Sequence, residues 1–208
     1  MGEVTFYTNP MSRGRIVRWL LEEIGQPYQV ELLDYATTLK APEFLALNPM
    51  GKLPAIRHRD VVVTETAAIC AYLADAFPAA GLAPPPGSPE RGAYYRWLFF
   101  AAGPAEAAIT NHNLGFHVPP EKQAMCGYGT YARTMDMMEH AISRSNYLAG
   151  AVFSAADIYF GSQIGFGLRF GSIEKRPAFE AYWQRISARP AALRAQAIDD
   201  DLLAARHN

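Results

Sequence analysis

The stretch Asn48-Pro49-Met50-Gly51-Lys52-Leu53-Pro54-Ala55-Ile56 says the most about the fold of this chain. Gly51 and the two prolines indicate a tight loop, and Pro54 stands directly before a short apolar run that is typical of a strand. Taken alone, Pro54 is best interpreted as an ordinary proline that opens a strand, because an X-Pro bond is cis only about one time in twenty. Its significance therefore depends on the elements around it.

Residue spacing on both sides of this loop predicts the order βαβαββα within the first 78 residues. Apolar residues alternate in the expected strands and recur at three- and four-residue spacing in the expected helices. The expected elements are a strand at 4–8, a helix from Ser12 to Gly25, a strand at 28–32, a short helix at 42–47, a hairpin of 53–57 and 61–63, and a helix that Pro78 ends. A long crossover followed later by a tight turn is the thioredoxin-like order of an α/β domain.

A linker at 79–89 separates this domain, residues 1–78, from a second domain at 90–208. The linker is rich in proline and glycine, which propagate neither a helix nor a central strand. No strand alternation follows it, so the second domain is expected to be entirely α-helical. Its expected helices are 91–109 with a kink at Gly103-Pro104, 121–142, 154–170 and 177–188.

Composition excludes several classes of protein. The 208 residues include 19 basic and 20 acidic side chains with no basic run, so we expect no nucleic-acid partner. No apolar stretch is long enough for a membrane span and no signal segment is evident, so we expect no membrane partner. Cys70 and Cys126 form no metal or disulfide spacing, and the five histidines are scattered, which predicts no metal site and a cytoplasmic location.

Three motifs together resemble the cytosolic glutathione S-transferase family, in particular bacterial-type members with a serine in the first turn. The loop 48–56 is similar to the family's loop with a cis proline, here Pro54. In that loop the preceding residue, here Leu53, offers its backbone N–H and C=O to the cysteinyl part of glutathione. The resemblance implies that glutathione is the co-substrate.

The second motif, Thr64-Glu65-Thr66, is similar to the family's acidic and hydroxyl pair at the start of a helix, although Thr66 replaces the commoner serine. A helix N-terminus with free N–H groups and a hydroxyl suits the carboxylate of the γ-glutamyl end of glutathione, and the Glu65 carboxylate suits its ammonium group. The alternative is a simple N-cap with an acidic first turn.

The third motif is the turn at 6–15, where family members place the group that activates the thiol. A free thiol titrates near pH 8.5, so a hydrogen-bond donor that favours the thiolate raises the fraction of nucleophile. Ser12 at the start of the first helix is the first candidate, and its alternative role is an N-cap. Tyr7 is the leading competitor, and Asn9 and Arg13 also carry donors that can reach the sulfur.

Lys40 and Lys52 are candidates for holding the glycine carboxylate of glutathione, because relatives often place a basic residue there. Either lysine is equally consistent with a solvated surface position.

In the second domain, Ser154 and Asp157 are similar to the family's capping box, with Phe153 before them as a staple residue. The aromatic cluster 94–100 covers every side of a helix, so part of it is expected to face a dimer interface or an apolar pocket rather than the core.

The resemblance implies a glutathione transferase that conjugates the thiolate to small hydrophobic electrophiles, acts in detoxification and forms a homodimer. The alternatives are a glutathione-dependent isomerase, dehalogenase or peroxidase on the same site, or a glutathione-binding module without activity.

Overall fold

The computed structural model describes residues 3–205 and divides into two compact units. The first unit combines the residues up to 80 with those from 188 onward, and the second unit comprises residues 81–187. The helical domain was expected to extend over 90–208, whereas the described residues 188–205 belong to the first unit. Within the described residues, no helix is both long enough and apolar enough to cross a membrane.

The first unit has the expected order βαβαββα, followed by a C-terminal helix that the sequence analysis did not predict. Its elements are β1 (Val4–Thr8), α1 (Gly14–Ile24), β2 (Tyr28–Leu32), the 3-10 turn η1 (Thr38–Lys40), α2 (Pro42–Leu47), β3 (Ala55–His58), β4 (Val61–Thr64), α3 (Thr66–Ala76), the 3-10 turn η2 (Pro78–Ala80) and α9 (Pro190–Ala204). The thioredoxin-like architecture expected from the residue spacing is confirmed.

The sheet has the strand order β2-β1-β3-β4. β1 pairs with β2 in parallel through the crossover α1, and the other two pairings are antiparallel. Successive side chains of a strand point to opposite faces. Phe6 therefore faces α1, where the Arg18 guanidinium lies 5.3 Å from the centre of its ring, while Tyr7 packs with Phe44 of α2 on the other face.

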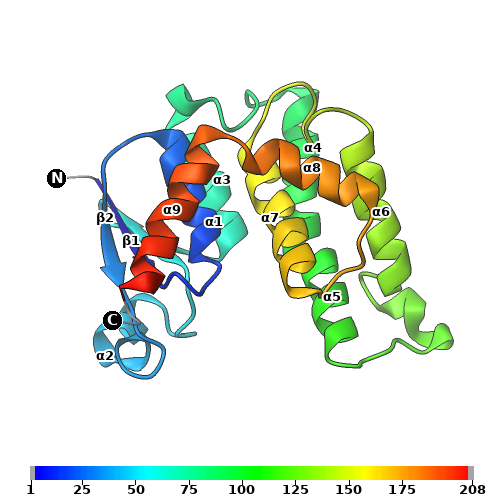
Figure 1. Ribbon diagram of the computed structural model, residues 1–208, viewed down its shortest axis with the longest axis horizontal. Helices are drawn as coiled ribbons and strands as arrows, with labels where there is room; N and C mark the ends of the chain where they lie inside the picture. The colour runs from blue at the N-terminus through cyan, green and yellow to red at the C-terminus, as the bar shows by residue number, and fades with distance from the viewer. Residues whose placement is uncertain (1–2, 206–208) are drawn as a thin grey trace. The chain divides into compact units, whose positions relative to one another are not determined.

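The helix α9 packs against α1 on the side of α1 away from the sheet (Figure 1). A buried ion pair joins the two helices, since Arg18 Nε lies 2.7 Å from Asp199 Oδ1 and both side chains are about 1% exposed. Arg18 Nη1 also donates to the Tyr28 hydroxyl at 3.3 Å. Burial raises the pKa of the Asp199 carboxyl, and the neighbouring Arg18 opposes that shift. The two charges are thus buried together, and the Tyr28 hydroxyl is a further partner of Arg18.

We expect Asp199→Ala to lower the free energy of unfolding by about 3–5 kcal/mol, because removing one partner leaves the Arg18 charge buried and uncompensated. Urea unfolding gives this difference. The matched control is Asp200→Ala, whose carboxylate is 47% exposed and should contribute about 1 kcal/mol or less. Equal losses in the two variants would contradict the assignment of α9 docking to the buried pair.

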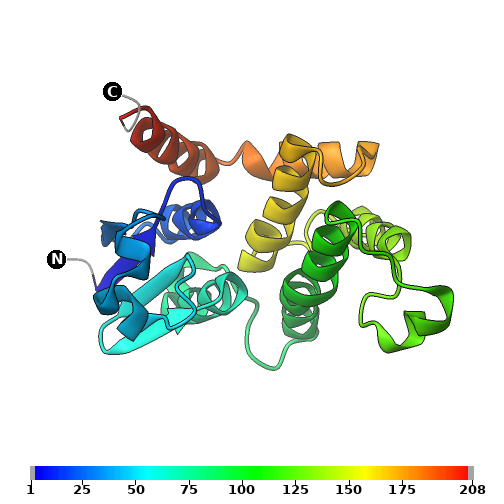
Figure 2. The same ribbon diagram turned by 90° about the horizontal axis from the view of Figure 1, so that it is seen from below.

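The second unit is entirely helical. Its elements are α4 (Pro89–Phe100), the π-helical turn η3 (Ala101–Ala105), α5 (Glu106–Asn113), the 3-10 segment η4 (Pro120–Met125), α6 (Tyr131–Ser143), α7 (Ala155–Phe170) and α8 (Pro177–Ser187). Figure 2 shows α7 between α8 and α4, and α7 is buried along most of its length. The expected all-helical class of this unit is confirmed.

Two of the expected helices are interrupted. The segment 91–109 changes to a π-helical turn at Gly103-Pro104, where proline cannot donate its backbone hydrogen bond. The segment 121–142 is α-helical only from Tyr131 onward, because the 3-10 segment η4 ends before Cys126, whose backbone is extended, and Gly129 has a positive φ of 66°.

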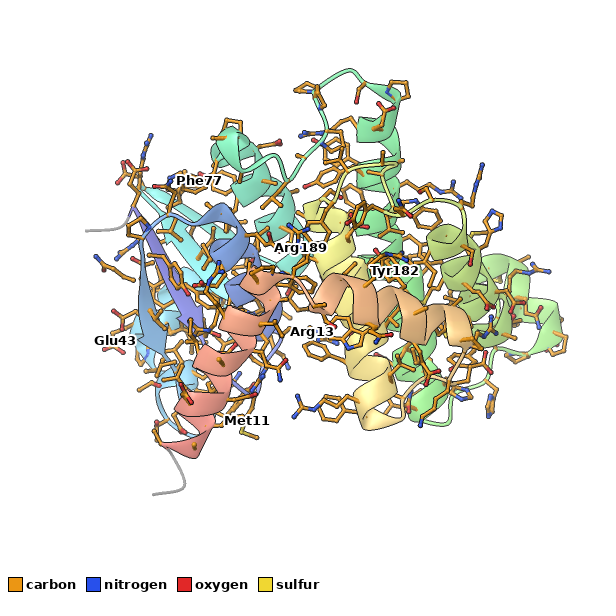
Figure 3. The ribbon with its side chains drawn as sticks, turned by 45° about the horizontal axis from the view of Figure 1, so that its top comes forward. Met11, Arg13, Glu43, Phe77, Tyr182 and Arg189 are labelled. Carbon is orange, nitrogen blue, oxygen red and sulfur yellow. The ribbon has the colours of Figure 1, made fainter. Side chains whose placement is uncertain are left out.

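The capping box before α7 is confirmed. The buried Asp157 carboxylate accepts the Ser154 backbone N–H at 2.8 Å, the Leu148 N–H at 2.8 Å and the Ser154 and Tyr182 hydroxyls at 2.9 and 2.7 Å. Tyr182 of α8 is labelled in Figure 3. Burial raises the pKa of the Asp157 carboxyl, and these four donors oppose the rise. The box therefore ties the start of α7 to α8.

Candidate functional site

Strand register brings the three sequence motifs to one edge of the sheet. Tyr7 of β1 is paired with Ala55 of β3, and Ala55 is paired in turn with Thr64 of β4. The first turn follows Tyr7 by two residues, Pro54 directly precedes Ala55, and Glu65 directly follows Thr64. Motifs that lie far apart in the sequence thus start from one row of paired residues.

Asn9 anchors the turn between β1 and α1. Its side chain is fully buried; Nδ2 donates to the Leu33 carbonyl at 2.7 Å, and Oδ1 accepts the Met11 N–H at 2.9 Å. Both ends of the amide are therefore engaged within the protein. The first turn residue is held to the segment that follows β2.

The Ser12 hydroxyl lies at the start of α1 and is also engaged locally. It donates to the Asn9 carbonyl at 2.7 Å and accepts the Gly14 N–H at 2.9 Å. The helix begins at Gly14, with Arg13 at the N-cap position. Ser12 therefore lies one residue before the N-cap, although its hydroxyl accepts the first helical N–H, and its single hydrogen points to the Asn9 carbonyl.

The position after Ser12 and Arg13 requires glycine. A Cβ at Gly14 would lie 1.9 Å from Thr8 Oγ1 and 2.8 Å from Ser12 Oγ, which is closer than any real contact. The sequence analysis did not single out Gly14, because the close approach arises from packing between the helix and the end of β1.

The other two candidates in this turn differ in exposure. Tyr7 is 8% exposed, and its ring packs in an apolar cluster with Leu39 and Phe44, 5.8 Å from the Phe44 ring centre. Arg13 is exposed, as is Met11, and Figure 3 labels both residues on either side of Ser12.

The proline loop is held by its own side chains, and its Leu53–Pro54 bond is cis. Asn48 Nδ2 donates to the Lys52 carbonyl at 2.9 Å, and Asn48 Oδ1 accepts the Met50 N–H at 3.2 Å. Leu53 is partly exposed before the buried Pro54. The isomer that the family resemblance implied is therefore present.

The two lysines occupy different positions relative to this loop. Lys40 Nζ donates to the Gly51 carbonyl at 2.9 Å, which fixes its ammonium group beside the loop. Gly51 has a positive φ of 56°, and a Cβ there would lie 2.7 Å from Lys40 Nζ. Lys52 is exposed. Of the two, Lys40 is the one whose ammonium group is bonded to the loop, through the Gly51 carbonyl eleven residues further along the chain.

Glu65 has a backbone conformation that is rare for a residue with a side chain. Its φ is 65° and its ψ is 118°, at the N-cap position of α3. Its side chain is exposed and does not cap the helix, whereas Thr66 is buried at the first helical position. Glu65, rather than Thr64 or Thr66, thus occupies the N-cap position of α3, and its side chain makes no capping hydrogen bond there.

We expect Glu65→Gly to be more stable than Glu65→Ala by about 1 kcal/mol. Glycine adopts positive φ without steric cost, and the strain of about 1–3 kcal/mol at such a position exceeds the entropy that glycine loses on folding. Both variants lack the carboxylate, so the comparison isolates the backbone. Urea unfolding of the pair measures it, and an alanine variant as stable as the glycine one would show that the backbone is unstrained.

The aromatic cluster of α4 divides between core and surface. Tyr94 and Trp97 are buried, and the Trp97 ring lies 5.8 Å from that of Phe160 in α7. Tyr95 and Phe99 are exposed, Phe99 to 72%. Cys70 is a core thiol, and burial raises its pKa to about 12. Among residues 3–205, no three His, Cys, Asp or Glu side chains are grouped closely enough to hold a metal ion.

Comparison with known proteins finds matches over both units. The model described as "Glutathione S-transferase, N-terminal domain" matches residues 11–76, and that described as "Glutathione S-transferase, C-terminal domain" matches residues 95–190. A glutathione transferase structure from Methylococcus capsulatus str. Bath is 30% identical with a TM-score of 0.77, covering 95% of this chain and 98% of that one. Glutathione S-transferase 3 of Zea mays is 28% identical, covering 92% of each chain. A sphingomonad glutathione S-transferase complexed with glutathione is 28% identical with a TM-score of 0.75, covering 94% of this chain and 98% of that one.

Proposed function

Because this chain belongs to the glutathione S-transferase family, we propose that Ser12 activates the glutathione thiol for attack on small hydrophobic electrophiles. The protein is a glutathione transferase, and glutathione is its co-substrate. The observation that carries the assignment of the site is the paired row Tyr7–Ala55–Thr64, from which all three motifs start.

The peptide part of glutathione is assigned to groups along this edge. We propose that the Leu53 backbone, before the cis Pro54, pairs with the cysteinyl residue. The N–H groups at the start of α3, with the Thr66 hydroxyl, suit the γ-glutamyl carboxylate, and the exposed Glu65 carboxylate suits the ammonium group. Lys40 is preferred to Lys52 for the glycine carboxylate, because its Nζ is already held at the loop.

Ser12 is preferred to its competitors because of what each side chain already does. The Asn9 amide is engaged at both ends, and the Tyr7 ring is packed in the core cluster. Ser12 has only to turn its hydrogen from the Asn9 carbonyl toward the sulfur. A donor at that position favours the thiolate, and the N-terminus of α1 adds positive potential. Arg13, exposed beside it, remains a second donor within the turn.

The conjugation step follows from these roles. The thiol proton leaves to solvent, and the thiolate forms a C–S bond at the electrophilic carbon while the leaving group departs with its electron pair. The peptide contacts hold the sulfur in register and lower the entropy cost of the encounter. The same thiolate serves an isomerase, dehalogenase or peroxidase, which are alternatives for the physiological reaction.

Two measurements on the purified protein test this proposal. We expect retention on immobilised glutathione and turnover of a reactive aryl halide with glutathione. Retention without turnover of any aryl halide, alkyl halide or peroxide would support a binding module instead. Failure of both measurements would contradict the proposed site as a whole.

We expect Ser12→Ala to raise the pKa of the bound glutathione thiol while changing glutathione affinity by less than about threefold. The hydroxyl favours the thiolate specifically, and each pKa unit corresponds to about 1.4 kcal/mol. Thiolate absorbance followed against pH gives the value. Tyr7→Phe is the paired control and should titrate as the unmodified protein does. A raised value in Tyr7→Phe with an unchanged one in Ser12→Ala would move the role to Tyr7.

We also propose a homodimer, supported by the exposed Tyr95 and Phe99 on α4. Exposed aromatic side chains are enriched at protein interfaces. Sedimentation at micromolar concentration should give about twice the chain mass of 22.9 kDa. Phe99→Lys should shift the sample toward the monomer, and a monomer in the unmodified protein would contradict this proposal.

Roles in detoxification and a cytoplasmic location remain proposals that rest on the family and on the free cysteines, Cys70 and Cys126.

A further inference from the structure

Two consecutive carboxylates of α9 engage two arginines on one face of α1. Arg15 and Arg18 are three residues apart, which places them on the same side of the helix. Arg18 pairs with Asp199 in the interior, and Arg15 Nη2 donates to Asp200 Oδ1 at 2.7 Å nearer the surface. The contact between the helices is thus made of one buried pair and one partly exposed pair.

The exposed pair is also connected to the turn that carries Ser12. Arg15 Nε donates to the Pro10 carbonyl at 2.6 Å, while its Nη2 holds Asp200. The planar guanidinium can address two acceptors in fixed directions at once. A chain of two hydrogen bonds therefore runs from α9 to the backbone of the turn, two residues before Ser12.

The direction of the Pro10 carbonyl affects where the following residues of this turn lie. The pyrrolidine ring fixes φ of Pro10, so rotation about its ψ is the remaining freedom that moves Met11 and Ser12 together. Asn9, the residue before Pro10, is held by the hydrogen bond from its side chain to the Leu33 carbonyl. The hydrogen bond from Arg15 fixes the direction of the Pro10 carbonyl itself. The position of Ser12 Oγ thus depends on both anchors.

We infer that Arg15 and Asp200 are positioning residues for the thiol-activating turn, so that α9 sets the placement of the Ser12 hydroxyl. This inference rests on the proposed role of Ser12. The two ion pairs have different roles. The buried Arg18–Asp199 pair keeps α9 docked on α1, and the Arg15–Asp200 pair fixes the turn before α1. A partly exposed pair contributes little to stability, about 1 kcal/mol or less, so its value lies in geometry.

The test uses Asp200→Asn and Arg15→Lys in the full chain. Lysine keeps the charge of Arg15 but has one nitrogen, which cannot hold Pro10 and Asp200 in the same fixed arrangement. We expect both variants to raise the pKa of the bound glutathione thiol and to lower kcat about tenfold, with KM for glutathione changed less than about twofold. A misplacement of even 1 Å can cost about a hundredfold in rate.

Asp201→Asn is the matched control, since Asp201 is the next residue of α9 and is exposed. It removes the same charge without touching Arg15. Loss of a negative charge by itself favours the thiolate and lowers the thiol pKa, which is opposite in sign to the effect of a misplaced donor. Equal thiol pKa values in Asp200→Asn and Asp201→Asn would therefore overturn the inference.

A double-mutant cycle separates this inference from the function on which it rests. In Ser12→Ala, adding Asp200→Asn should change the thiol pKa and kcat no more than adding Asp201→Asn does, because the positioned group is already absent and only the loss of charge remains. Additive effects would show that Asp200 acts by another route and would overturn the positioning role. If Ser12→Ala alone leaves the thiol pKa unchanged, the assignment of Ser12 fails first, and the positioning role fails with it. If Ser12→Ala raises the pKa of the bound thiol and Asp200→Asn does not, only the positioning role is refuted.

Discussion

The register of β1, β3 and β4 is the constraint on which the candidate site depends. Because Tyr7, Ala55 and Thr64 lie in one row, the segments that leave this row on the same side of the sheet are brought together. A shift of one residue in either pairing would turn the side chains of a strand to the opposite face and separate Pro54 from the first turn. The apolar faces enforce the register, since Phe6 and Ile56 face one set of helices while Tyr7 packs against Phe44 on the other.

Above this row, short hydrogen bonds from buried polar side chains fix each loop. Asn9 fixes the first turn and Asn48 the proline loop, each by using both ends of its amide. Buried polar groups are costly unless they are bonded, so each asparagine specifies one loop conformation by excluding others. The Ser12 hydroxyl differs from these two amides because it has a single hydrogen to donate. Its one hydrogen is directed to the Asn9 carbonyl, and the proposed function requires that hydrogen to turn toward the glutathione sulfur.

The groups that stabilise the fold lie next to the groups to which we assign a function. The buried pair Arg18–Asp199 and the buried Asp157 network carry energetic weight, while partly exposed groups such as Asp200 contribute little to folding. Glu65 shows the opposite arrangement, since a strained backbone is retained at the edge where the proposed ligand groups converge. Strain of this kind persists only where the surrounding fold holds the residue in place.

The sequence by itself determined the order βαβαββα, the helical class of the second unit, the capping box and the positions of the three motifs. These depend on local spacing and on turn residues, which act within a few positions of the chain. It did not predict α9, although Pro190 at the first helical position was a usable signal, nor the interruption of the segment 121–142. Only the tertiary structure decided that Tyr7 packs in a core cluster, that Glu65 has a positive φ and that α9 joins the first unit. The physical reason is distance along the chain: Arg18 and Asp199 are 181 residues apart and Arg15 and Asp200 are 185 apart, so no local pattern pairs them.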